Sequence, residues 1–226
     1  IFFFSMYVVY FGRKISIQYT KFVDIHKYTS KIAELSQDVS IPKYATHLIY
    51  LTRAKRKDSV EEKIMDSILE KIPKRANVYW LYHINRTNQP YTLDYEIDEL
   101  VEDKIIKITL NVGFRIQPKI ELYFKKIIND LIQNQELNLH TQDNIYSKYS
   151  SQSDFKFIIT EKYLSVENEF SLREGFILKT YFLYKHLGQR DERAFGLDKS
   201  DVEIEYYPFV YHPIQEVKLE RRNRGN

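Results

Sequence analysis

Cysteine is absent from this sequence of 226 residues, and glycine occurs only six times. The lack of cysteine excludes disulfide bonds, thiolate metal sites and a cysteine nucleophile, and it suits a reducing compartment. The glycine-rich signatures of phosphate loops and nucleophile elbows, G-x-G-x-x-G, G-x-x-x-x-G-K-[ST] and G-x-S-x-G, do not occur. The enzyme classes that depend on those loops therefore lose their usual signature.

A strong excess of charge of one sign is also missing. The 34 basic and 31 acidic side chains give a net charge of +3, which marks neither nucleic acid nor anionic lipid as the main partner. The six histidines never stand four residues apart, so we expect no helical metal-binding pair and no metal site. The acidic residues between positions 94 and 103 are interpreted as the solvated edge of a hairpin, with acid–base catalysis as the alternative.

The sequence does have a markedly apolar beginning. Ten of its first eleven residues are apolar or aromatic, and Arg13 and Lys14 follow directly. A secretory signal would carry its basic residues before the apolar stretch, so a signal peptide is disfavoured. Because the stretch starts without a polar cap, and basic residues outnumber acidic ones after it, we predict that residues 1–14 are the end of a severed transmembrane helix. The alternative is a buried first element of an ordinary domain.

Residues 15–39 are predicted to be an amphipathic connector helix. Its apolar residues are Phe22, Ile25, Tyr28, Ile32 and Leu35. Their spacing of three or four residues places them on one helical face. Pro42 interrupts this pattern, and residues 40–215 are predicted to form one α/β domain. The last residues, 216–226, are predicted to be a frayed tail.

Strand and helix patterns alternate within the predicted domain. Strands are predicted at 45–52, 78–84, 91–97, 106–112, 155–163 and 202–206. Helices are predicted from residue 60 to near Pro73, at 120–132 and at 170–187, and a long surface loop at 133–153. The strand at 78–84 is apolar on both faces, so it should lie at the centre of the sheet. In the alternating strand at 106–112, Lys107, Thr109 and Asn111 are expected on a half-exposed side. This order predicts an α/β fold, with a mixed, mainly parallel sheet flanked by helices.

Polar residues follow two of the predicted strands. Thr52 and Arg53 end the strand at 45–52, while His83 and Asn85 end the strand at 78–84. Ligands of α/β sheets tend to bind at the carboxyl ends of the strands, so these four residues are candidates for holding a phosphate or a nucleotide. The alternative is that they are ordinary polar loop residues, and that His83 is a structural histidine within an apolar strand.

Six stretches of the chain, in order, resemble one known family. They are SIPKYATHLIYLT (40–52), KIPKRANVYWLYHI (71–84), NQPYTLDYEID (88–98), LNVGFRIQPKI (110–120), DFKFIITEKYLS (154–165) and AFGLDKSDVEIEYYPFVY (194–211). Together they resemble the C-terminal cytoplasmic region of bacterial KUP/HAK/KT potassium transporters. The beginning, IFFFSMYVVYFGRK, then resembles the end of the last transmembrane helix of that family.

The resemblance implies a function that belongs to a longer protein. Members of the family take up potassium together with protons through a membrane bundle of about twelve helices, whose ion sites lie at the bilayer midplane. No potassium or proton residue can be carried over to this chain, which is implied to lie on the cytoplasmic side of the cell membrane. The resemblance further implies a universal-stress-protein-like fold, a homodimer and regulation by cyclic di-AMP. No glycine-rich nucleotide loop occurs here, which argues against ATP.

Two other functions are weighed. One is a stand-alone nucleotide-binding signalling protein, whose apolar beginning would be a buried segment. The other, which the resemblance to the family suggests, is an enzyme such as a nucleotide cyclase; it is disfavoured because no metal-binding pattern of carboxylates lies on identifiable strands. We therefore expect a non-enzymatic domain without a cofactor, whose partners are its own transmembrane bundle, a second copy and a cyclic dinucleotide, but not nucleic acid.

Overall fold

The computed structural model of the chain describes residues 2–70, 72–134, 155–165, 168, 170–187, 197 and 201–210. Its elements are α1 (Phe2–Gln18), β1 (Phe22–Asp24), the 3-10 helix η1 (Ile25–Lys27), α2 (Thr29–Gln37), β2 (Lys43–Thr52), β3 (Ser59–Glu61), α3 (Glu62–Leu69), β4 (Arg75–Thr87), β5 (Leu93–Val101), β6 (Ile105–Gly113), α4 (Ile120–Gln133), β7 (Phe155–Leu164), α5 (Leu172–Leu187) and β8 (Asp201–Phe209). The predicted loop at 133–153 and the predicted tail lie almost wholly outside the described residues.

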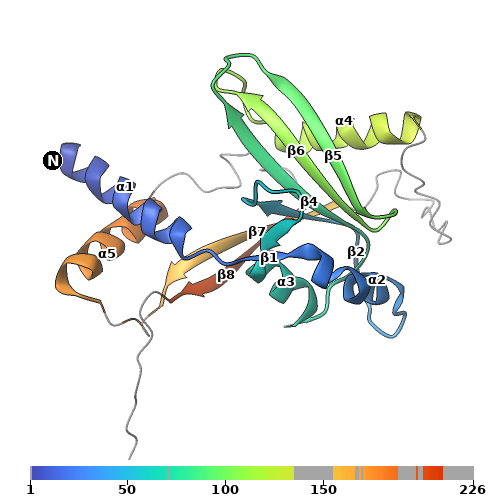
Figure 1. Ribbon diagram of the computed structural model, residues 1–226, viewed down its shortest axis with the longest axis horizontal. Helices are drawn as coiled ribbons and strands as arrows, with labels where there is room; N and C mark the ends of the chain where they lie inside the picture. Colours follow the sequence, from blue (N-terminus) through green and yellow to red (C-terminus); the bar gives the residue numbers. More distant parts are fainter. Residues whose placement is uncertain are drawn as a thin grey trace, which may run out of the picture. The chain divides into compact units, whose positions relative to one another are not determined.

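One six-stranded sheet, in the order β5-β6-β4-β2-β7-β8, organises these elements (Figure 1). The pairs β2–β4, β2–β7 and β4–β6 are parallel, while β5 pairs antiparallel with β6. The predicted α/β fold with a mixed, mainly parallel sheet flanked by helices is therefore confirmed. A second, two-stranded sheet of β1 and β3 was not predicted, because strands of three residues leave almost no pattern in a sequence.

Strand β4 is the central strand that its composition predicts. Eight consecutive residues, from Ala76 to His83, are buried, since apolar clusters cover both faces of the strand. On one face Trp80 and Tyr82 pack with Phe124 of α4. On the other face Tyr79 and Leu81 belong to the cluster that contains the buried residues of α2 and α3. Burial on both sides explains why β4 is apolar at both parities.

The predicted connector helix over residues 15–39 is not one helix. Its first residues end α1, after which the chain forms β1, η1 and α2. Ile25, Ile32 and Leu35 are buried as their spacing predicts, but Phe22 lies in β1, where it pairs with Glu61 of β3. The carboxylate of Asp24 accepts a hydrogen bond from the His26 amide and so caps η1. The helical periodicity of residues 15–39 therefore does not produce a single helix, because β1 pairs with the distant strand β3 and Asp24 starts a new element.

The chain divides into two compact units. One comprises residues 20–161 and 189–205, and the other comprises residues 1–19, 162–188 and 206–226. In the second unit, α1 packs against α5 at Gly12, where a Cβ atom would lie 2.4 Å from Cγ of Tyr181, so only glycine allows this approach. Among the described residues, no helix is both long enough and apolar enough to cross a membrane, α1 having 17 residues.

Candidate functional site

Three of the four predicted site residues, Thr52, His83 and Asn85, lie on one face of the sheet at the carboxyl ends of its parallel strands, and Arg53 directly follows β2. Thr52 of β2 is the register partner of His83 in β4, and His83 is the partner of Thr109 in β6. Asn85 follows two residues later on the same face and is the partner of Asn111. The parallel register therefore brings residues that are far apart in sequence to a single polar edge.

Glu61, which no sequence motif marks, fixes the backbone at the end of β2 by hydrogen bonds. Its buried carboxylate accepts a hydrogen bond of 2.6 Å from the Thr52 hydroxyl and another of 2.6 Å from the Arg53 amide. The Thr52 hydroxyl in turn accepts a bond of 3.1 Å from the Ala54 amide. Thr52 is thus engaged as both donor and acceptor within the protein. Glu61 stands in the run RKDSVEE, where nothing distinguishes it from its acidic neighbours.

The His83 imidazole is buried beside the end of β2. Its Nδ1 atom lies 3.0 Å from the Thr52 carbonyl oxygen, which can only accept, so Nδ1 carries the proton and donates. Burial is the main cause that lowers the pKa of His83, and the nearby Lys107 ammonium lowers this pKa further. His83 therefore links β4 to the end of β2 through this hydrogen bond.

Lys107 is the largest departure from the sequence prediction at this edge. It was expected on a half-exposed side, yet it is only 1% exposed. Its Nζ atom donates to the carbonyl oxygens of Arg56, Lys57 and Ser59, the last at 3.0 Å. Burial lowers the pKa of Lys107, whereas Glu61 acts in the opposite direction. The loop between β2 and β3 covers the ammonium group. The alternation of polar and apolar residues in a strand does not predict burial by a distant loop.

Asn85 belongs to a second hydrogen-bonded set. Its Nδ2 atom donates to Asn111 Oδ1 at 2.8 Å, and Asn111 Nδ2 donates to Asp94 Oδ1 of β5 at 2.6 Å. Farther along β5, Asp98 forms an ion pair of 2.6 Å with Lys57. The acidic run on β5 is therefore part of a hydrogen-bonded edge, and two of its carboxylates are tied to neighbouring side chains.

The loop that Lys107 holds presents positive charge to solvent. Its sequence from residue 53 is RAKRKD, and the side chains of Arg53, Lys55 and Arg56 are exposed. No ion pair within the described part of the chain involves these three residues. Such a loop attracts anions, while the buried groups beneath it fix its backbone. No cluster of three potential metal ligands is found among the described residues.

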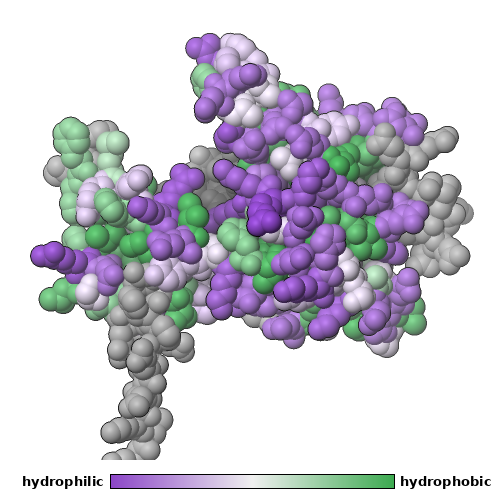
Figure 2. All heavy atoms as spheres, viewed as in Figure 1, coloured by the Kyte–Doolittle hydropathy of each residue, from purple (hydrophilic) through white to green (hydrophobic). Residues whose placement is uncertain are grey.

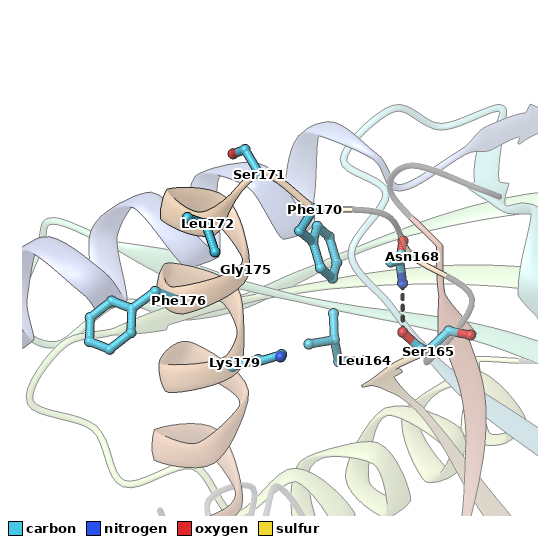
Figure 3. A pocket seen from close by; sticks show the side chains of 9 residues that line it. All are labelled: Leu164, Ser165, Asn168, Phe170, Ser171, Leu172, Gly175, Phe176 and Lys179. Carbon is cyan, nitrogen blue, oxygen red and sulfur yellow. Dashed lines mark hydrogen bonds between the residues drawn. The ribbon is translucent and has the colours of Figure 1, made fainter. Parts of the chain in front are cut away.

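A separate pocket lies in the unit that contains α1 and α5. It is open, has a volume of about 630 Å³ and is lined mainly by α5 and by the end of β7. Lys179 extends its amine toward Leu164, whereas Phe176 points away from the pocket (Figure 3). Asn168 donates a hydrogen bond of 2.8 Å to the Ser165 carbonyl at the rim (Figure 3). The pocket holds none of the predicted site residues.

Comparison with known proteins gives one consistent answer. The family model described as "K+ potassium transporter C-terminal domain" matches residues 45–217. A protein of Flavobacterium psychrophilum is 44% identical over 216 residues, which is 96% of this chain and 33% of the relative. Proteins of Flavobacterium johnsoniae and Clostridium perfringens are 42% and 32% identical, each over 96% of this chain and about a third of the relative.

All three relatives carry the name "Probable potassium transport system protein Kup". The chain spans about a third of the length of these curated relatives. No solved structure matches it.

Proposed function

The chain belongs to the family of K+ potassium transporter C-terminal domains, and from this membership we propose that it is the cytoplasmic regulatory domain of a potassium:proton symporter in the cell membrane. The family match over residues 45–217 is the observation that carries the proposal. Because the chain corresponds to about a third of its relatives, ion transport itself would reside in the remaining two thirds. The domain would act in dimerisation and control, and it would not be an enzyme.

The properties of α1 support attachment to a membrane bundle. Only a narrow strip of α1, at Val8, Gly12 and Ser16, is buried, and large apolar side chains such as Phe3 are exposed around the rest. A helix that is apolar nearly all round is typical of a membrane or core environment. The basic pair of residues 13–14 follows, as expected on the cytoplasmic side of a span. We propose that residues 1–14 end the last membrane helix and that residues 15–39 connect it to the domain.

Reconstitution of the full-length transporter tests this function. Proteoliposomes that contain it should accumulate potassium when a proton gradient is imposed, and collapse of the gradient should abolish the uptake. Empty liposomes under the same gradient are the control. Absence of potassium flux would remove the proposed function.

The regulatory ligand that we propose is cyclic di-AMP, bound near Thr52, Arg53, His83 and Asn85. Thr52 and His83 are bonded to protein atoms, so the phosphates would contact Arg53 and the basic loop that follows it. Two phosphates close to a set of exposed cations would give charge-assisted hydrogen bonds.

Calorimetry on the full chain in detergent tests this ligand. Arg53→Gln should weaken binding at least about tenfold, the loss of one strong charge-assisted contact. Lys63→Gln is the matched control, because Lys63 lies on α3 and is already paired with Asp66. Absence of saturation at tens of micromolar would exclude this site while leaving the transport proposal intact. Light scattering of the same sample tests the dimer.

A further inference from the structure

The outer face of α5 carries an apolar stripe that nothing in the described residues covers. Leu172, Phe176 and Leu183 are 95%, 58% and 56% exposed. Spacings of four and seven residues place the three side chains on one side of the helix. The stripe extends over about 16 Å, at 1.5 Å per residue. Exposed apolar side chains aligned on one side of a helix are a feature of interaction sites.

This stripe is not what attaches α5 to its own unit. The opposite side of the helix, with Gly175, Leu178 and Phe182, is buried and packs in a cluster that includes Phe209. The stripe instead continues onto α1, because the rings of Phe176 and Phe4 lie 6.0 Å apart. Figure 2 shows apolar residues gathered where Figure 1 draws α1 and α5.

Positive charge accompanies the stripe. Lys179 lies between Phe176 and Leu183 along α5 and extends its amine toward the pocket beside the stripe (Figure 3), and Arg173 is exposed beside Leu172. No ion pair in the described part of the chain involves either cation. The acidic residue of the first turn, Glu174, is engaged by the Ser171 hydroxyl at 2.6 Å.

We propose that the outer face of α5 docks onto a bilayer of anionic phospholipid. Leu172, Phe176 and Leu183 enter the boundary between headgroups and acyl chains, and Lys179 contacts lipid phosphates beside the open pocket that it lines. The exposed cations beside the apolar stripe, Arg173 and Lys179, match an anionic surface, which an uncharged protein groove does not offer. The inference rests on the proposed membrane anchoring of α1, which would keep α5 near the same bilayer. The small net charge of the whole chain does not oppose it, because the charges on α5 are local.

Dyes attached to single introduced cysteines test the docking. The chain has no cysteine of its own, so each dye reports one position. The full chain with Leu183→Cys carries an environment-sensitive dye and is mixed with vesicles of phosphatidylcholine alone or with equal parts of phosphatidylglycerol. The emission should shift to the blue only with the anionic vesicles. The same dye at Phe114→Cys is the control, because Phe114 is 60% exposed but lies at the end of β6. Its emission should not change.

A charge variant tests the role of the lysine. Lys179→Gln should lower the partition coefficient for anionic vesicles about fivefold, the value of one lysine near an anionic surface, and should reduce its dependence on salt. Lys31→Gln, an exposed lysine on α2, is the matched control and should change neither quantity. Circular dichroism verifies that both variants are folded.

A third label, at Tyr7→Cys on α1, separates this inference from the proposed anchoring. If the label on Tyr7→Cys reports lipid while the label on Leu183→Cys stays in water, the docking of α5 is refuted and the anchoring stands. If only the label on Leu183→Cys responds, the docking stands and the anchoring fails. A shift at Leu183→Cys that follows protein concentration without lipid would assign the stripe to a second copy of the chain and overturn the proposal.

Discussion

His47 should make the stability of the domain depend on pH. The imidazole is only 2% exposed, and its Nδ1 atom accepts a hydrogen bond of 3.2 Å from Nε1 of Trp80. A protonated Nδ1 could not accept this bond, so the folded protein holds His47 in its neutral form. Burial, assisted by the charge of Lys43, lowers the pKa of His47 from 6.5 to about 4.

The sign and size of the effect follow from proton linkage. Because the pKa is lower in the folded state, the unfolded state takes up a proton first as the solution is acidified. The contribution of His47 is therefore complete above about pH 6.5 and is lost as the pH falls through about pH 4. A difference of between two and three pKa units corresponds to about 3 kcal/mol. This is a large part of the total stability of a typical domain, about 5–15 kcal/mol.

Urea unfolding measures this contribution, with fluorescence of the single tryptophan, Trp80, as the probe. His47→Asn keeps an oxygen that can accept from Trp80 but cannot titrate. The difference in unfolding free energy between wild type and His47→Asn should change by about 3 kcal/mol between pH 7 and pH 4, in favour of the variant. His26→Asn is the comparison variant, because it makes the same substitution at an exposed histidine. A difference between wild type and His47→Asn that is constant with pH would refute the reasoning.

Three further substitutions follow from particular contacts. The buried hydroxyl of Tyr82 has no hydrogen-bond partner among the described residues, so Tyr82→Phe should raise the free energy of unfolding by up to about 1 kcal/mol, and a loss measured by urea unfolding would contradict this. Lys107→Met should lower that free energy by about 2 kcal/mol and speed tryptic cleavage within residues 53–58, because the loop loses its hydrogen bonds to the ammonium group. Lys104→Met is the control and should change neither quantity. Equal cleavage rates in the two variants would contradict the role of Lys107 in fixing the loop. Gly12→Val should separate α1 from α5, because its side chain would overlap Tyr181, and faster proteolysis of α1 would reveal it; an unchanged digestion pattern would show that the helices can adjust.

Most of the α/β order could be predicted from the sequence, because each element carries a local pattern. The alternating residues of β6, the strand β4 that is apolar on both faces, and the three-to-four spacing in α4 each reflect burial of one or two faces. The prediction failed where the local pattern was overruled, as in residues 15–39. There Phe22 completes a helical spacing but pairs in a strand with Glu61.

The sequence identified the strand ends that carry Thr52 and His83, but it did not predict the hydrogen-bond network around them. Ligands of α/β sheets tend to bind at the carboxyl ends of the strands, which makes Thr52 and His83 candidates. The parallel register places these two residues side by side. The sequence did not predict that Glu61 and Lys107 belong to this network. A carboxylate beside other charged residues and a lysine in an alternating strand both resemble solvated residues. The site itself stays a prediction until ligand binding is measured.

The sequence by itself determined the family of the chain and most of the order of its strands and helices, because both depend on residue types and short spacings. Only the tertiary structure decided that Lys107 is buried under a basic loop and that α5 has an apolar face that no described residue covers. Burial depends on which distant segments meet, and no local period records such a meeting. The environments of Lys107 and Leu183 therefore depend on segments that lie far away along the chain.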